Sequence, residues 1–247
     1  AKEPEIVDTA NFLNAMGASI KGAGTDVIRI EGADSFCSVS HTIIPDRIEA
    51  GTFMVAAVAT DGEIVVEDVI PKHLEAITAK LREAGADINV EADQIKVKRG
   101  PKLLPVDVKT FVYPGFPTDL QPLVMTLLTA AEGTSVITEN VFEARFRHVD
   151  ELKRMGAQIK VEGRTAVIEG GSPLTGAPVK ATDLRAGAAM LVGGFMAQGE
   201  TILTGVEQIY RGYENIEFKL MNLGARLKHI RSSPFGVSRE SSRWNSG

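Results

Sequence analysis

Residues 117–133, PTDLQPLVMTLLTAAEG, predict an α-helix that is apolar on nearly every side and begins at a carboxylate. A helix without a wide polar face is expected to be buried. Asp119 stands at the expected N-cap, and Pro122 falls in the first turn, where proline is tolerated. The start of a helix presents unpaired N–H groups and a partial positive charge, which suit phosphates and carboxylates. We therefore expect functional chemistry at the start of this helix.

The same pattern occurs three times along the chain. Asp46, Asp119 and Asp183 each precede a small-residue apolar segment that ends at a glycine. A β-branched run and then an amphipathic segment follow each glycine, which predicts a strand and a second helix. We expect the closing glycines to take the left-handed conformation of a helix C-terminus. These glycines are Gly62, Gly133 and Gly199, and the second helices are expected at 73–84, 145–155 and 213–223.

A Gly-Ala step closes four helical segments at a nearly constant period. Its glycines, Gly17, Gly85, Gly156 and Gly224, are 68, 71 and 68 residues apart. Short paired strands are expected after the step, which completes a β-α-β-α-β-β unit of about 70 residues. Three such units would cover residues 42–230, and residues 1–32 have the pattern of the second half of a fourth. The repeat predicts an α/β fold in which the three first helices lie together inside and the sheets lie outside.

Three observations bear on domain organisation and setting. Residues 33–41 are expected to be a linker, and the Ser-rich tail at 232–247, with Trp244, is expected to be disordered. A formal charge of -5 argues against general binding to nucleic acid or a membrane surface. A single cysteine, Cys37, excludes an internal disulfide and fits a cytoplasmic setting. The longest apolar stretch, 186–197, is too short to span a bilayer.

Arginines near the helix starts are the candidate anion ligands. Arg185 follows Asp183 by two residues, so it either faces a cleft or forms a structural ion pair with that aspartate. Arg145 precedes the second helix of the middle unit and is either an anion ligand or solvated surface. Arg211 lies in a turn that could close over a ligand. Asp119 is either a general base or a plain helix cap, and the residues alone favour the cap.

Metal and cofactor chemistry has no support in the sequence. The four histidines, His41, His73, His148 and His229, lack the spacing of metal ligands and are expected at the surface. Neither a Walker loop nor a dinucleotide-binding fingerprint is present. We therefore expect no metal and no organic cofactor.

With these residues in view, the chain resembles the UDP-N-acetylglucosamine enolpyruvyl transferases. The similarity extends in order over residues 1–230. It rests on EPEIVDTANFLNAMGA (3–18), GAGTDVIRIEG (22–32), IPDRIEAGTF (44–53), YPGFPTDLQ (113–121), VFEARFRHVDELKRMGA (141–157), ATDLRAGAA (181–189) and RGYENIEFKLMNLGA (211–225).

The resemblance implies an inside-out α/β barrel lobe of three βαβαββ repeats with buried helices, one of two lobes in the enzyme. Residues 44–231 would form most of this lobe, and residues 1–43 would be the end of the other lobe plus a linker. The family transfers the enolpyruvyl group of phosphoenolpyruvate to the 3′-hydroxyl of UDP-N-acetylglucosamine, the first committed step of peptidoglycan synthesis. These two small molecules, and a missing N-terminal half, are the partners that the resemblance implies.

The resemblance also assigns roles to single residues. Asp119 would take the proton of the attacking sugar hydroxyl, which changes the preferred interpretation of Asp119 from cap to base. Val141 would line the sugar-nucleotide site through its backbone. Arg145 and Arg185 would hold the carboxylate of phosphoenolpyruvate. Arg211 would contact the phosphate side of phosphoenolpyruvate, and Asp183 would hold the arginines in place.

Two departures from the family pattern limit this expectation. Tyr210 and Asn215 stand where the family usually has Asp before, and Arg after, its Arg-Gly-Tyr-Glu motif. The family's Lys-Asn pair and its loop cysteine have no counterpart here, and Cys37 does not match that cysteine. We therefore expect the chain to be a C-terminal portion that is inactive alone. The alternatives are the sibling transferase acting on shikimate 3-phosphate and a non-catalytic anion-binding lobe.

Overall fold

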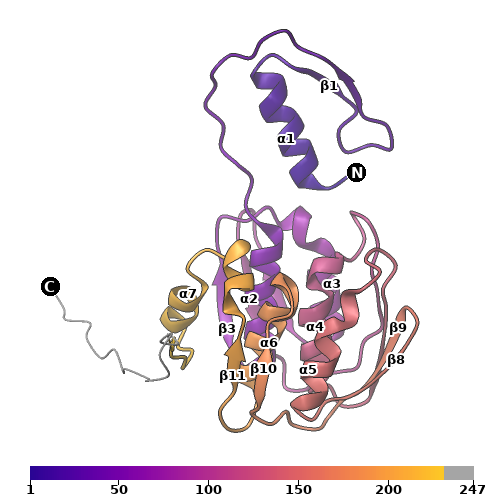
Figure 1. Ribbon diagram of the computed structural model, residues 1–247, viewed down its shortest axis with the longest axis vertical. Coiled ribbons are helices and arrows are strands. Elements are labelled where there is room, and N and C mark those ends of the chain that lie inside the picture. The colour runs from indigo at the N-terminus through magenta and orange to yellow at the C-terminus, as the bar shows by residue number, and fades with distance from the viewer. Residues whose placement is uncertain (231–247) are drawn as a thin grey trace, which may run out of the picture. The chain divides into compact units, whose positions relative to one another are not determined.

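The structure, a computed structural model, describes residues 1–230 (Figure 1). The tail at 232–247, including Trp244, lies outside the described residues. The chain divides into two compact units, one comprising residues 1–213 and the other beginning at Glu214. The predicted boundary near residue 43 stays a prediction.

Three buried helices occupy the interior of the larger unit. They are α2 (Arg47–Ala59), α4 (Gln121–Leu128) and α6 (Leu184–Met196), and every residue of α4 is buried. Helix α4 packs against both α2 and α6 (Figure 1). Glycines permit this close approach: a Cβ on Gly51 would lie 2.7 Å from Leu120 Cδ1, and one on Gly193 would lie 3.3 Å from Thr126 Cγ2. The prediction that the first helices are buried together is confirmed.

Helix α4 differs from the expected helix at both ends. A 3₁₀ turn, η2 (Thr118–Leu120), precedes it, and the regular helix ends at Leu128. Leu120, which offers no side-chain cap, occupies the N-cap position. The prediction that Asp119 is the N-cap is therefore wrong, because the 3₁₀ turn carries Asp119 outside the helix.

Short strands form four separate sheets in the described chain, and none of these sheets closes into a barrel. One three-stranded antiparallel sheet has the order β3-β5-β4, and a four-stranded sheet has the order β6-β7-β9-β8, in which β6 and β7 are parallel. The other two sheets are the antiparallel pair β1-β2 and the parallel pair β10-β11. The bounds are β1 (Ser19–Lys21), β2 (Arg29–Glu31), β3 (Glu63–Val66), β4 (Asp87–Val90), β5 (Ile95–Lys98), β6 (Val108–Lys109), β7 (Thr134–Thr138), β8 (Gln158–Glu162), β9 (Thr165–Glu169), β10 (Pro178–Lys180) and β11 (Ile202–Thr204).

The β-α-β-α-β-β pattern is complete only in the middle of the three sequence repeats. In the first repeat, residues 42–46 form no strand, and in the third repeat no strand follows the last helix within the described residues. The second helices are shorter than expected, because 3₁₀ turns replace their first residues in the first two units. The remaining elements are α1 (Pro4–Ala15), η1 (Pro71–Leu74), α3 (Glu75–Glu83), η3 (Arg145–His148), α5 (Val149–Arg154), η4 (Val206–Arg211) and α7 (Ile216–Asn222).

The Gly-Ala steps share one helix-ending geometry. In each, the glycine has a positive φ, and the following alanine donates its N–H to a carbonyl five residues back, as Ala157 does to Leu152. Gly133 and Gly199 also have positive φ, as expected. Gly62 does not, because Asp61 takes the left-handed position with φ 57°.

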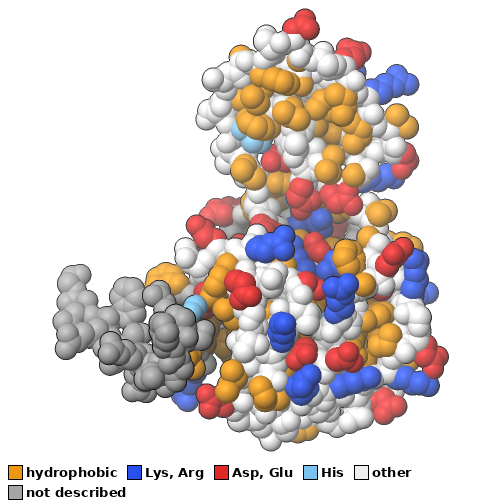
Figure 2. Space-filling model, in the orientation of Figure 1, with side chains coloured by type: hydrophobic (Ala, Val, Ile, Leu, Met, Phe, Trp, Pro, Cys, Tyr) orange, Lys and Arg blue, Asp and Glu red, His pale blue; other side chains and the backbone are white. Residues whose placement is uncertain are grey.

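The surface carries charges of both signs. On the face in Figure 2, Lys and Arg side chains are interspersed with Asp and Glu side chains. Within residues 1–230, no helix combines the length and apolar character needed to cross a bilayer.

Candidate functional site

Asp119 lies between two arginines that come from distant parts of the sequence. Its Oδ1 is 2.9 Å from Arg145 Nη2, and its Oδ2 is 3.3 Å from Arg185 Nη2. The Asp119 side chain is 37% exposed, whereas Arg145 and Arg185 are 8% and 14% exposed. The turns before α4 and α5 and the first turn of α6 thus meet at one point. The Asp119 carboxylate is thus flanked by two guanidinium groups in an acidic protein.

The aspartates at equivalent positions of the three repeats make different contacts. Asp46 accepts the N–H groups of Ile48 and Glu49, and Asp183 accepts those of Arg185 and Ala186, so both cap their helices. The Asp119 side chain caps no helix and contacts arginines instead. Because a carboxylate oxygen has more than one acceptor position, Asp119 can still accept a proton from a hydroxyl at its exposed edge.

Arg185 is held in place while part of its fork has no partner. Its Cζ lies 5.5 Å from the ring centroid of Tyr213, and its buried Nη1 has no hydrogen-bond partner. Burial lowers the pKa of Arg185, but Tyr213 and Asp119 oppose this effect and the net pKa is raised. The alternative of an ion pair with Asp183 is not found, because that carboxylate accepts the backbone N–H of Arg185. A buried N–H without an acceptor is costly, so an anion that reached Nη1 would satisfy it.

Tyr213 is anchored to α2 by a directed hydrogen bond. Its Oη lies 2.8 Å from Thr52 Oγ1, and that hydroxyl donates its proton to the carbonyl of Ile48. Thr52 has one proton, so Tyr213 must be the donor in their contact. Burial raises the pKa of Tyr213, so the phenol stays neutral and can make this donation.

Arg145 and Arg147 have different environments. Arg145 is buried, donates from Nε to Thr118 Oγ1 at 3.1 Å and lies with its Cζ 4.2 Å from the ring centroid of Phe142. Arg147 is exposed. The alternative of solvated surface is therefore wrong for Arg145, which η3 turns inward.

His148 is fully buried, so the prediction that all four histidines lie at the surface is wrong for this one. Its Nδ1 is 2.9 Å from the carbonyl oxygen of Arg145, and its Nε2 is 3.2 Å from Met125 Sδ. A carbonyl only accepts, so Nδ1 carries the proton and supports the backbone of Arg145. Burial lowers the pKa of His148 to about 4.

The depressed pKa of His148 predicts a loss of stability in mild acid. The unfolded chain binds a proton at an ordinary histidine pKa of about 6.5, whereas the folded chain binds it only near pH 4. Stability is therefore complete above about pH 6.5 and is lost as pH falls toward 4. Between pH 7 and 5 we expect His148 to account for about 2 kcal/mol of lost unfolding free energy.

Urea unfolding of the wild type and of His148→Gln at pH 7 and at pH 5 measures the contribution of His148 to the unfolding free energy. The pH-dependent loss should be about 2 kcal/mol smaller in His148→Gln. Equal losses in the two proteins would mean that His148 is protonated in the folded state.

The other predicted site residues are Val141, Arg211 and Asp183, and they make fewer contacts with the Asp119 cluster. Val141 is exposed and its N–H is donated to Glu139 Oε1 at 2.9 Å, which leaves the carbonyl as its backbone group for a ligand. Arg211 ends η4, which packs against α6, but its exposed side chain forms no ion pair with a residue in the range 1–230. Asp183 acts on Arg185 through the backbone only.

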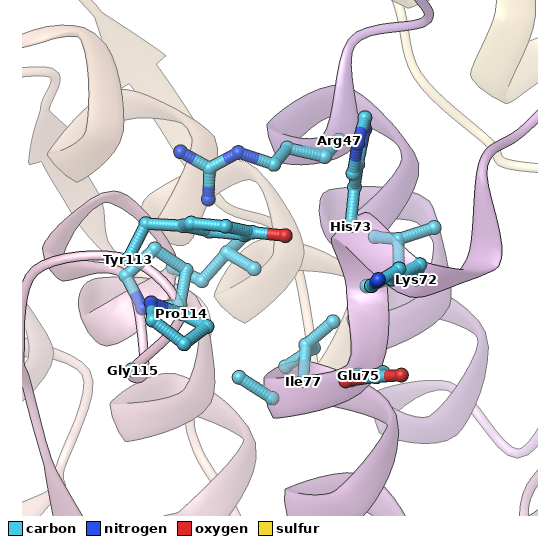
Figure 3. A pocket seen from close by; sticks show the side chains of 12 residues that line it. Arg47, Lys72, His73, Glu75, Ile77, Tyr113, Pro114 and Gly115 are labelled. Atoms are coloured by element: carbon cyan, nitrogen blue, oxygen red, sulfur yellow. The ribbon is translucent and has the colours of Figure 1, made fainter. Parts of the chain in front are cut away.

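A hollow with basic side chains lies beside the turn that carries Asp119, with Pro117 and Leu120 in its lining. Figure 3 shows Arg47 over the ring of Tyr113, with His73 on the facing wall, and the Arg47 Cζ is 5.6 Å from the ring centroid. Arg47 is already paired with Glu5, with Nε 2.8 Å from Oε1. Burial and the charge of Arg47 lower the pKa of His73. Arg47 donates from both Nε and Nη2 to Glu5, whereas Nη1 of Arg185 has no partner.

Sequence reasoning missed the residues that support the arginines. Thr118, Glu139 and Tyr213 all contact a predicted site residue. Glu139 could have been noticed, since it is an acid at the end of a β-branched run that is expected to be buried. Tyr213 follows Arg211 by two residues, but nothing in its position along the chain points to Arg185.

Comparisons with known proteins agree on one family. Residues 1–220 match the family described as EPSP synthase (3-phosphoshikimate 1-carboxyvinyltransferase). UDP-N-acetylglucosamine 1-carboxyvinyltransferase 2 of Bacillus cereus is 61% identical over 227 residues, which are 92% of this chain and 53% of that protein. UDP-N-acetylglucosamine 1-carboxyvinyltransferase of Clostridium botulinum is 57% identical over 93% of this chain and 55% of that protein.

Solved structures agree with these sequence matches. The enolpyruvyl transferase NikO from Streptomyces tendae aligns with a TM-score of 0.80 and 30% identity, over 91% of this chain and 54% of that one. EPSP synthase from Acinetobacter baumannii shares the fold, with a TM-score of 0.66 and 23% identity over 87% of this chain and 53% of that one. The chain thus spans about half the length of the relatives that it matches.

Proposed function

Since the chain belongs to the EPSP synthase (3-phosphoshikimate 1-carboxyvinyltransferase) family, we propose that it supplies part of the active site of an enolpyruvyl transferase. The acceptor is the 3′-hydroxyl of UDP-N-acetylglucosamine, and the donor is phosphoenolpyruvate. The reaction belongs to peptidoglycan synthesis and takes place in the cytoplasm. Identities of 57–61% with enzymes named for the UDP-sugar support this acceptor over shikimate 3-phosphate.

One observation carries the proposal: Asp119 lies between Arg145 and Arg185, whereas the equivalent aspartates cap helices. A capping carboxylate accepts backbone N–H groups and so stabilises its helix. The Asp119 carboxylate instead contacts two guanidinium groups. Such a cluster binds an anion and accepts a proton at the same place, as attack of a hydroxyl on phosphoenolpyruvate requires.

Each residue has a role in this proposal. Asp119 accepts the proton of the sugar hydroxyl as the oxygen bonds to C2 of phosphoenolpyruvate, and C3 takes up a proton from solvent, which gives a tetrahedral adduct. The adduct then loses phosphate from C2 and a proton from C3 to solvent, which restores the carbon–carbon double bond in the enolpyruvyl product. Arg145 and the free Nη1 of Arg185 bind the carboxylate of phosphoenolpyruvate. Arg211 approaches the phosphate from η4, Asp183 fixes the backbone of Arg185, and the Val141 carbonyl faces the sugar.

The arginines also offset the charge of the protein as a whole. Both substrates are polyanions, and the chain has a formal charge of -5. Local guanidinium groups in a partly buried site attract an anion more strongly than the same groups in water. An enolpyruvyl transferase lobe therefore needs no overall basic surface. The arrangement of these lobes as inside-out barrels is part of the proposal, with the buried helices at the centre.

Titration of the isolated chain tests the acceptor and the extent of the site. We expect weak, saturable binding of UDP-N-acetylglucosamine by isothermal titration calorimetry and no binding of shikimate 3-phosphate. We also expect no phosphate release from phosphoenolpyruvate until the part of the Bacillus cereus relative that the chain does not match is added. Tighter binding of shikimate 3-phosphate would favour the sibling activity, and binding with no release after that addition would favour a non-catalytic lobe.

A further inference from the structure

Glu139 is a buried carboxylate that lies one residue beyond β7 and is only 2% exposed. Its Oε1 accepts from the Thr110 hydroxyl at 2.7 Å and from two backbone N–H groups, those of Val141 and Phe142, at 2.9 Å each. Its Oε2 accepts from the Thr118 hydroxyl at 3.0 Å. A buried charge is costly unless it is well bonded, so four donors indicate a built site for this carboxylate.

Thr118 connects Glu139 to the anion site with a fixed direction. Its hydroxyl has one proton, and that proton points to Glu139 because a carboxylate only accepts. The lone pairs of Thr118 Oγ1 are therefore left for the Arg145 Nε–H, which donates at 3.1 Å. The Arg145 Nη2 then reaches Asp119 Oδ1. Glu139 thus determines that Thr118 accepts from the arginine.

A second connection passes through Phe142. Its N–H is held by Glu139, and its ring lies 4.2 Å from the Arg145 Cζ. The guanidinium is therefore fixed at its edge by Thr118 and at its face by Phe142, and both contacts originate at Glu139. Together with the bond from Nη2 to Asp119, these contacts hold the guanidinium both in its plane and over its face.

We propose that Glu139 and Thr118 are positioning residues of the anion site, which hold Arg145 in the orientation that receives the carboxylate of phosphoenolpyruvate. They touch no substrate and act through Arg145. The assignment of the ligand rests on the proposed function, whereas the positioning of Arg145 does not. The loop at 139–142 is fixed by the same carboxylate, so the sugar side at Val141 and the anion side at Arg145 share one anchor.

Thr118 offers a sharper test than Glu139, because its substitutions leave the buried carboxylate and the loop hydrogen bonds in place. Thr118→Val keeps the side-chain shape but removes the acceptor for Arg145 Nε, and Thr118→Ser keeps the hydroxyl. We expect Thr118→Val to weaken binding of phosphoenolpyruvate about tenfold, from the loss of one hydrogen bond to a charged group. Thr118→Ser should stay close to the wild type.

Isothermal titration with phosphoenolpyruvate is done on the wild type, both Thr118 variants, Arg145→Met and the double variant Thr118→Val with Arg145→Met. If Thr118 acts through Arg145, Thr118→Val has no further effect once Arg145 is removed. The same weakening in both backgrounds, or no weakening by Thr118→Val alone, would overturn the proposal. Loss of affinity in Thr118→Ser equal to that in Thr118→Val would also contradict it.

A readout without ligand separates this inference from the proposed function. The Nε–H of Arg145, assigned in ¹⁵N NMR spectra by its absence in Arg145→Met, should exchange slowly with water in the wild type. Exchange should become at least several-fold faster in Thr118→Val and remain slow in Thr118→Ser. Unchanged exchange in Thr118→Val would refute the positioning. If exchange is faster in Thr118→Val as expected but the wild type binds no phosphoenolpyruvate, the ligand assignment alone is refuted.

Discussion

Asp119→Ala is expected to lower kcat by on the order of 10²-fold or more, the range of a lost general base. The measurement uses this chain joined to the part of the Bacillus cereus relative that it does not match, with phosphate release as the readout. The carboxylate lies between Arg145 and Arg185, so its removal also deletes a negative charge beside the anion site. Affinity for phosphoenolpyruvate should therefore be unchanged or increased while kcat falls.

The capping aspartate of the first repeat is the matched control. Asp46 accepts two backbone N–H groups at the start of α2, so Asp46→Ala should cost about 0.5–2 kcal/mol of stability. Its kcat should remain near that of the parent enzyme. If Asp119→Ala instead loses stability and affinity with little change in kcat, Asp119 is a structural partner of the arginines and the base lies elsewhere.

Arg185→Met is expected to weaken phosphoenolpyruvate binding by about 10²-fold, the upper range for a charge-assisted hydrogen bond. The buried Nη1 has no protein partner, so an anion can bond to it without breaking an existing hydrogen bond. Arg185→Lys keeps the positive charge but offers one nitrogen in place of the two, Nη2 and Nη1, that serve Asp119 and the anion in this account. We expect this lysine variant to recover only a small part of the lost affinity.

Arg147→Met controls for the loss of any positive charge near the site. Arg147 is exposed and lies two residues from Arg145, so its removal should change the affinity for phosphoenolpyruvate less than threefold, as expected for an exposed charge. Calorimetric titration of the three variants, with melting temperatures recorded alongside, gives the comparison. If Arg147→Met and Arg185→Met weaken phosphoenolpyruvate binding equally, the affinity comes from the overall positive charge near the surface and not from a specific contact with Arg185.

The sequence predicted the architecture because the repeat appears in its hydrophobic pattern. The all-round apolar segments became the buried helices α2, α4 and α6, and the Gly-Ala steps became helix ends with positive φ. Side-chain periodicity and glycine conformation are local properties, so a single sequence displays them. Closure of the sheets is not local, and the expected barrel is not closed in the described strands.

The clustering of three candidate site residues could be predicted for the same reason. Asp119, Arg145 and Arg185 lie at helix starts, and buried helices packed together bring their starts together. The contacts that support them depend on partners from other elements, such as Tyr213 on Thr52 and Thr118 on Glu139. His148 was misassigned to the surface because its Nδ1 bonds to the carbonyl of Arg145, and no spacing rule indicates that partner.

The central claim is that Asp119, Arg145 and Arg185 form one site for an anionic reactant. A crystal structure of the chain with phosphoenolpyruvate, at a concentration that calorimetry shows to be saturating, tests it most directly. The account predicts that an oxygen of the ligand lies within about 3.2 Å of Arg185 Nη1 and that another contacts Arg145, with Asp119 still at the edge of the site. Phosphoenolpyruvate bound at saturation away from both arginines would contradict it.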